Sequence, residues 1–194
     1  AEDTNLASVT AKDGEDAAVT LTNPTTSGNK KTYTYDVSAE AVHSVVFTAT
    51  DDFGLSKAFT VNVTVDKTAP VHTSGPALTW DDRKETGWHN QSQVVMKSLV
   101  FTDTNGSGVK EYLYAYAGYA STPTADQYPT SYETFNNNAA NGVKVKVEEG
   151  EYNYIFIKAV DKAGNESDVK VLGPYKFDRS APEVSITRPE KNGD

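Results

Sequence analysis

The sequence predicts an all-β protein made of tandem antiparallel β-sandwiches, and three observations lead to this fold class. Short runs rich in β-branched and aromatic residues alternate in the way that strands do. Gly, Asn, Asp or Pro separates these runs, and no stretch has the period and length of a helix. Several phrases occur twice, which indicates that one unit is written twice.

Strands are expected in both halves of the chain. The clearest alternating runs lie at 31–37, 43–50, 57–65, 108–117, 142–148 and 151–160. Further strands of the second half are expected near 71–79, 92–102 and 168–178. Two antiparallel sheets packed face to face in each unit would bury the apolar positions of these runs.

A repeated phrase divides the chain into modules. Asp66-Lys-Thr-Ala-Pro70 returns as Asp178-Arg-Ser-Ala-Pro182, and 47–61 aligns with 157–171. Proline lacks an N–H and restricts the backbone of the residue before it. The phrase therefore ends the hydrogen-bonded strands of one module and connects them to the next module by a short, restricted segment. The expected modules are a first domain over 1–66, a second over 67–178, and a linker with the start of a following module over 179–194.

The second copy is the longer one. Asp51 and Asp161 are matched at a greater separation than Asp3 and Asp103. The second copy therefore carries an insertion between Asp103 and Asp161. The Tyr- and Asn-rich stretch near 118–141 is the candidate.

The first copy is expected to lack its first strands, because segment 70–100 has no counterpart there. Addition of a strand from another chain is one arrangement that such an open edge permits.

Three phrases of the second copy carry a family resemblance. The stretches GWHNQSQVVMKSLVFTDTNGSGVKEY (87–112), AVDKAGNES (159–167) and FDRSAPEV (177–184) resemble the tandem immunoglobulin-like repeats of secreted or wall-anchored surface proteins, particularly those of Gram-positive bacteria. The first copy departs from the pattern, with DDFGLS at 51–56. The resemblance implies immunoglobulin-like sandwiches, an extracellular location, and neighbouring modules of the same chain as partners.

One loop has the composition of a calcium site. Asp103, Asn105 and Ser107 occupy alternate positions, and such oxygen ligands suit Ca²⁺. An Asx-turn accounts for the pattern equally well, and no other cofactor is expected. The three histidines are isolated and lack the spacing of a zinc site: His43, His72 and His89.

Aromatic residues form the one unusual concentration. Two expected neighbouring strands carry them at alternate positions, and the insertion adds more, giving a set of candidate ligand-binding residues: Tyr112, Tyr114, Tyr116, Tyr154, Phe156, Tyr119, Tyr128 and Tyr132. We expect the strand aromatics to share one sheet face. That face is either covered by the insertion or exposed as a platform for sugars or a protein partner.

Charge and missing motifs exclude several functions. The net charge of −9 opposes binding to nucleic acid, and no apolar run is long enough to insert into a membrane. Cysteine is absent, and the chain has no nucleophile elbow or phosphate-binding glycine loop. Glu149 and Glu151 flank Gly150 as solvated hairpin charges, so an enzyme is not expected.

Two functions remain, because the missing catalytic triads and metal-ligand patterns disfavour a catalytic sandwich. The favoured one is a non-enzymatic stalk or spacer of a bacterial surface protein, with adhesion to a host protein or glycan. The alternative is an accessory carbohydrate-binding or spacer region of a secreted, multimodular, glycan-active enzyme.

Overall fold

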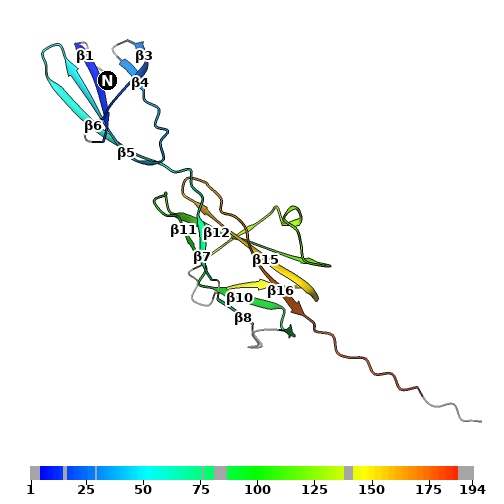
Figure 1. Ribbon diagram of the computed structural model, residues 1–194. Coiled ribbons are helices and arrows are strands. Elements are labelled where there is room, and N and C mark those ends of the chain that lie inside the picture. The colour runs from blue at the N-terminus through cyan, green and yellow to red at the C-terminus, as the bar shows by residue number, and fades with distance from the viewer. Residues whose placement is uncertain are drawn as a thin grey trace, which may run out of the picture. The chain divides into compact units, whose positions relative to one another are not determined.

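The computed structural model describes residues 5–14, 17–28, 30–75, 77–80, 87–137 and 142–187 (Figure 1). The described part contains sixteen strands and one 3₁₀ turn, which confirms the all-β class. Two compact units divide the chain: residues 1–71, 101–110 and 159–167 form the first, and residues 72–100, 111–158 and 168–194 the second. The expected domain boundaries after residues 66 and 178 stay predictions. Parts of three expected segments lie outside the described residues: 1–4, 138–141 and 188–194.

The first unit contains two sheets. The larger has the strand order β2-β1-β5-β6, and the smaller is the hairpin β3-β4. All of these neighbours pair antiparallel. The strands are β1 (Leu6–Asp13), β2 (Ala17–Val19), β3 (Thr22–Ser27), β4 (Lys30–Thr34), β5 (Ala41–Asp51) and β6 (Ser56–Val65).

The remaining strands form three sheets, ordered β13-β12-β15-β16-β9, β14-β10-β8 and β11-β7. Only the short β9 pairs parallel among the described strand pairs. The elements are β7 (Val71–Ser74), β8 (Ala77–Trp80), β9 (Trp88–His89), β10 (Gln93–Lys97), β11 (Val100–Thr102), β12 (Val109–Tyr119), η1 (Ala125–Gln127), β13 (Glu133–Phe135), β14 (Val143–Lys146), β15 (Gly150–Asp161) and β16 (Lys170–Phe177). No helix in this described part is long and apolar enough to cross a membrane.

Two expected strands, 71–79 and 92–102, are each broken once. Gly75 has φ +74°, and Ser98 has φ 57°. A Cβ on residue 75 would lie 2.2 Å from the Ser98 carbonyl oxygen, so only glycine allows this close approach. The paired kinks let each run leave the β7–β11 ladder and join the sheet of β8 and β10.

The core of the second unit centres on β15, whose residues Asn153–Ile157 are all buried. Ile155 and Ile157 are fully buried, as is Val94 on β10. Apolar residues from both sheets therefore close this core, which is the arrangement expected of a sandwich.

Truncation of this core should destabilise the second unit. We expect Ile155→Ala to lower the free energy of unfolding by about 2–5 kcal/mol, because it leaves a cavity at a fully buried position. Ile186→Ala is the matched control, since that side chain is 87% exposed. Urea unfolding followed by circular dichroism measures both changes, and equal losses would contradict the assignment of Ile155 to the core.

Candidate functional site

The repeated Asp-Lys/Arg-Thr/Ser-Ala-Pro phrase folds into the same turn at both places. The Oδ1 atom of Asp66 accepts a hydrogen bond from the Thr68 N–H at 3.1 Å. The Oδ1 atom of Asp178 accepts one from the Ser180 N–H at 2.8 Å. Each aspartate thus caps its own backbone two residues on, which is the Asx-turn geometry.

The aligned β-turns are also capped by matched aspartates. Asp161 Oδ1 accepts hydrogen bonds from the N–H groups of Gly164 at 2.6 Å and Asn165 at 2.8 Å. In the first copy, Asp51 Oδ1 accepts them from Phe53 at 2.9 Å and Leu55 at 2.8 Å. A carboxylate that accepts backbone N–H bonds satisfies donors that the tight turn leaves unpaired.

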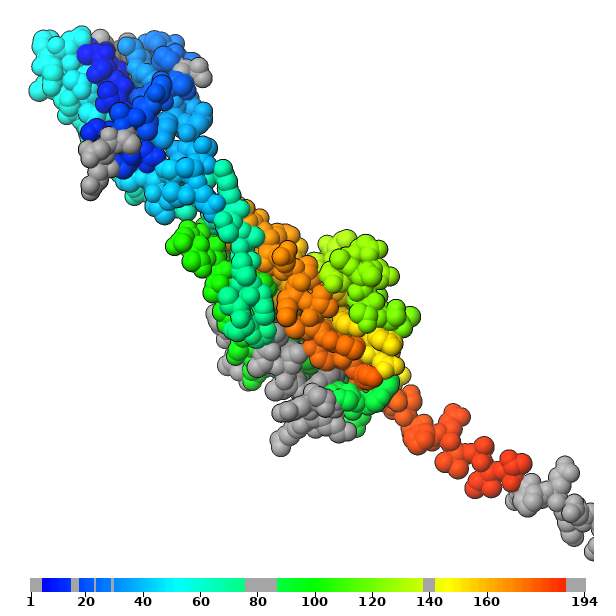
Figure 2. All heavy atoms as spheres, in the orientation of Figure 1, coloured from blue at the N-terminus to red at the C-terminus, as the bar shows by residue number. Residues whose placement is uncertain are grey.

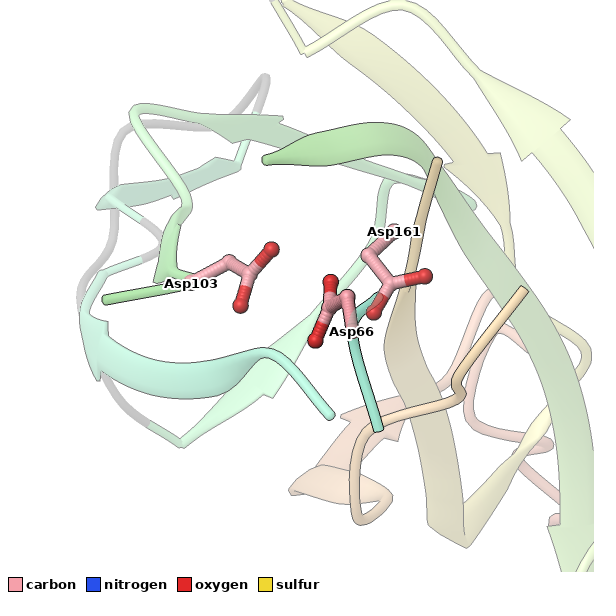
Figure 3. Close-up of side chains that lie close together, drawn as sticks. All are labelled: Asp66, Asp103 and Asp161. Carbon is pink, nitrogen blue, oxygen red and sulfur yellow. The ribbon is translucent and has the colours of Figure 1, made fainter. Parts of the chain in front are cut away.

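Two of these turns and the loop after β11 bring their aspartates together. Asp66 follows β6, Asp103 follows β11 and Asp161 ends β15, and all three belong to the first unit. One carboxylate oxygen from each lies within 4.8 Å of the others. Figure 3 shows the carboxylates of this cluster facing one another from three separate segments. We call Asp66, Asp103 and Asp161 the carboxylate cluster.

Hydrogen bonds hold the three segments of the cluster together. The Ser107 N–H donates to Asp66 Oδ2 at 2.7 Å, and the Ser107 Oγ accepts from the Ala163 N–H at 3.1 Å. The Asn165 side-chain amide donates to the Asp66 carbonyl at 3.2 Å and to Asp161 Oδ2 at 2.8 Å. The Ser107 hydroxyl, followed by the Ser107 N–H, lowers the pKa of Asp66 from its ordinary value because both stabilise the ionised carboxylate.

Asp103 presents an unsatisfied oxygen to this cluster. Its Oδ2 accepts a hydrogen bond from the Gly108 N–H at 2.6 Å. Its Oδ1 is buried and has no hydrogen-bond donor among the described residues. A Cβ on residue 106 would lie 2.1 Å from that Oδ1, so Gly106 leaves the room in which the carboxylate sits. A buried carboxylate oxygen without a hydrogen-bond partner raises the free energy of the folded state. This indicates that a bound group supplies the missing partner.

The cluster fits a hard divalent cation. Oxygen ligands bind Ca²⁺ at about 2.3–2.6 Å, so two ligands of one ion lie no more than about 5 Å apart. The separations of up to 4.8 Å meet this limit. No ion pair joins these carboxylates to a basic side chain in the described ranges. Asp66 and Asp161 are only 9% and 0% exposed, so their charges are poorly screened by water.

The predicted calcium trio is only partly gathered at this place. Asp103 belongs to the cluster, and Ser107 supports Asp66 by hydrogen bonds. Asn105 lies exposed, with a left-handed φ of 63°. Sequence reasoning missed Asp66 and Asp161 as ligands, although each stands in a stretch that occurs twice in the chain.

The expected single aromatic face is wrong. Tyr154 and Phe156 on β15 pack with Ala115 of β12, so they share a face with the odd-numbered residues of that strand. Tyr116 instead donates a hydrogen bond to Asn153, which points to the opposite face. Alternation fixes the faces within one strand, but pairing register decides which faces of two strands coincide.

Segment 119–132 covers the Tyr154 face. Tyr119 and Tyr128 lie with ring centroids 6.2 and 4.9 Å from that of Phe156, and Tyr132 packs on the same cluster. Tyr154 is 4% exposed and Phe156 is fully buried. Figure 2 shows this segment as a yellow-green lobe on the second unit.

On the other face, Phe135 of β13 is the cross-strand partner of Tyr112 and lies beside Tyr114. The ring centroids of Tyr112 and Tyr114 each lie 5.8 Å from that of Phe135, which is 7% exposed. Tyr114 also donates to a Glu133 carboxylate oxygen at 3.0 Å. The candidate aromatic residues therefore pack within the unit on both sides of the sheet.

Comparisons with known proteins identify no family for this chain. No protein-family model matches the chain, and a search of curated proteins finds no significant match. Among solved structures, the fibronectin(III)-like modules of Clostridium thermocellum CbhA are similar, with a TM-score of 0.39 and 12% sequence identity. That alignment covers 96% of this chain and 87% of the other.

Loss of one hydroxyl should change the titration of Asp66. We expect Ser107→Ala to raise the pKa of Asp66 toward its ordinary value of 3.8, because the largest stabilising contact of the carboxylate is removed. In the wild type the folded-state pKa lies below the unfolded one. The stabilisation is therefore complete above pH 3.8 and is lost as pH falls through the lower folded-state pKa.

Carboxyl-carbon NMR without added metal measures this titration directly. Ser56→Ala is the matched control, because Ser56 hydrogen-bonds Thr50 and has no contact with the cluster. An unchanged pKa of Asp66 in the Ser107→Ala protein would show that the hydroxyl does not support it.

Proposed function

We propose that this chain is a non-enzymatic stalk or spacer of an extracellular bacterial surface protein, and that calcium stabilises it at the carboxylate cluster. One observation carries the proposal: the buried, unpartnered Oδ1 of Asp103 lies with two further carboxylates at separations that suit one ion. Millimolar calcium outside cells would fill a site of the modest affinity usual for extracellular modules.

The arrangement of the cluster supports a structural role. Its carboxylates are held by main-chain amides of tight turns, including those of Thr68, Gly108 and Gly164. Such fixed acceptors suit the holding of an ion. A bound ion would tie the Asp66 turn to segments 101–110 and 159–167 of the same unit.

Two further observations favour a stalk over an adhesive lectin-like module. Stacking on a sugar requires an accessible ring face, but Tyr154 and Phe156 are buried. Asp178 also repeats the turn of Asp66, as expected if modules follow one another in a series.

Calcium should stabilise the chain through Asp103. We expect the wild type to bind Ca²⁺ with a Kd of about 10⁻⁴–10⁻³ M and to gain about 2.7 kcal/mol of stability at one hundred times that concentration. Asp103→Asn should weaken binding by about tenfold or more, because a charged ligand becomes neutral. Isothermal titration calorimetry and thermal unfolding measure both effects.

Asp52→Asn is the matched control, since Asp52 is an exposed aspartate of the same unit outside the cluster. A second readout is tryptic cleavage after the exposed Lys67, which calcium should slow in the wild type and not in Asp103→Asn. A wild type that shows no response to calcium, or an equal loss in Asp52→Asn, would refute the calcium site.

A further inference from the structure

The first unit contains an open apolar groove of about 750 Å³. Residues of β1, β5 and β6 line one side, and residues of β4 line the other. Phe47 and Phe59 lie directly opposite each other on β5 and β6. Phe59 is 70% exposed and Leu55 is 71% exposed. The main apolar lining residues are Leu6, Val9, Tyr33, Phe47, Ala49 and Phe59.

This groove lies where the core of a sandwich would be. Among the described residues of strands β1–β6, only Ala11 and Val45 are buried hydrophobic residues. A sheet with one apolar face needs a second layer to cover that face. The hairpin β3-β4 supplies part of such a layer, and no other strand among the described residues covers the rest of the sheet face.

The second unit shows which element fills the equivalent space. β4 and β14 correspond, because each is the strand before the one that ends in a capping aspartate, Asp51 or Asp161. β14 pairs antiparallel with β10, with Val145 opposite Val94 and Val143 opposite Met96. Val94 is fully buried and Met96 is 3% exposed, so β10 fills the space between the sheets.

The described part of the first unit has no strand in the position of β10. β4 pairs with β3 and with no other described strand, so one edge of β4 offers backbone donors and acceptors. Basic residues stand around the same groove, namely Lys30, Lys31 and Lys57, with Asp51 as the acidic one. An open strand edge beside an apolar floor is the recognition surface of β-strand addition.

We propose that this groove binds an extended polypeptide strand, which pairs antiparallel with the open edge of β4 and inserts alternate apolar side chains between the two sheets. The occupant has the pattern of β10. It also carries a carboxylate at the end that reaches Lys30, which is exposed and is the first residue of β4. This site is separate from the carboxylate cluster and does not depend on calcium.

A synthetic peptide tests the proposal on the full chain. The probe has the sequence of residues 90–101 with Lys97→Glu, which places a carboxylate near Lys30 in the register of β10. The control peptide carries Val94→Asn and Met96→Asn in addition. Fluorescence anisotropy should show saturable binding of the probe and about tenfold weaker binding of the control, because the inserted side chains have become polar.

Two matched protein variants locate the binding. Phe59→Ser should weaken probe binding several-fold, whereas Phe53→Ser should not, since Phe53 is 79% exposed and lies outside the groove. Hydrogen exchange of the amides of 30–34 should slow by about tenfold in the presence of the probe. Circular dichroism confirms that both variants are folded.

Three results would overturn the proposal. They are the lack of saturable binding by the probe, equal affinity for the two peptides, and binding that leaves the exchange of the β4 amides unchanged. The peptide-binding assay is run without calcium. A negative result in it therefore does not contradict the calcium site, and a chain that does not bind calcium can still be tested for peptide binding.

Discussion

The mutual repulsion of Asp66, Asp103 and Asp161 is the constraint that shapes the loops of the first unit. Like charges within 4.8 Å repel strongly where water is largely excluded. The chain offsets this repulsion with N–H and hydroxyl donors from three segments, most of them on Ser107, Gly108, Gly164 and Asn165. The tight turns of the repeated phrases therefore have two roles: they reverse the chain, and they orient a carboxylate toward the cluster.

Much of the architecture could be read from the sequence because alternation and turn residues are local signals. The runs that became β5, β6, β12 and β15 were identified within a few residues of their ends. The breaks at Gly75 and Ser98 could not be read in this way. They arise because two strands change partners together, which is a property of the packed sheets and not of either run alone.

The candidate site was only partly predictable for a related reason. Asp103 stands out because its own loop resembles a calcium loop, whereas Asp66 and Asp161 come from distant repeated stretches that carry no such pattern. The aromatic residues illustrate the same limit. Alternation placed Tyr112, Tyr114 and Tyr116 on one face of β12, but the face of β15 that lies beside them depends on register, which no single strand encodes.

The hydrogen bond from Asn165 to the Asp66 carbonyl has a kinetic consequence, because it joins residues that are 99 positions apart in the chain. Closing so long a loop is entropically unfavourable, so contacts of this kind form after the local hairpins. Interactions that are missing from the folding transition state chiefly affect the rate of unfolding. An ion held at the carboxylate cluster would therefore lengthen the lifetime of the folded chain under load or heat, with little effect on how fast it first folds.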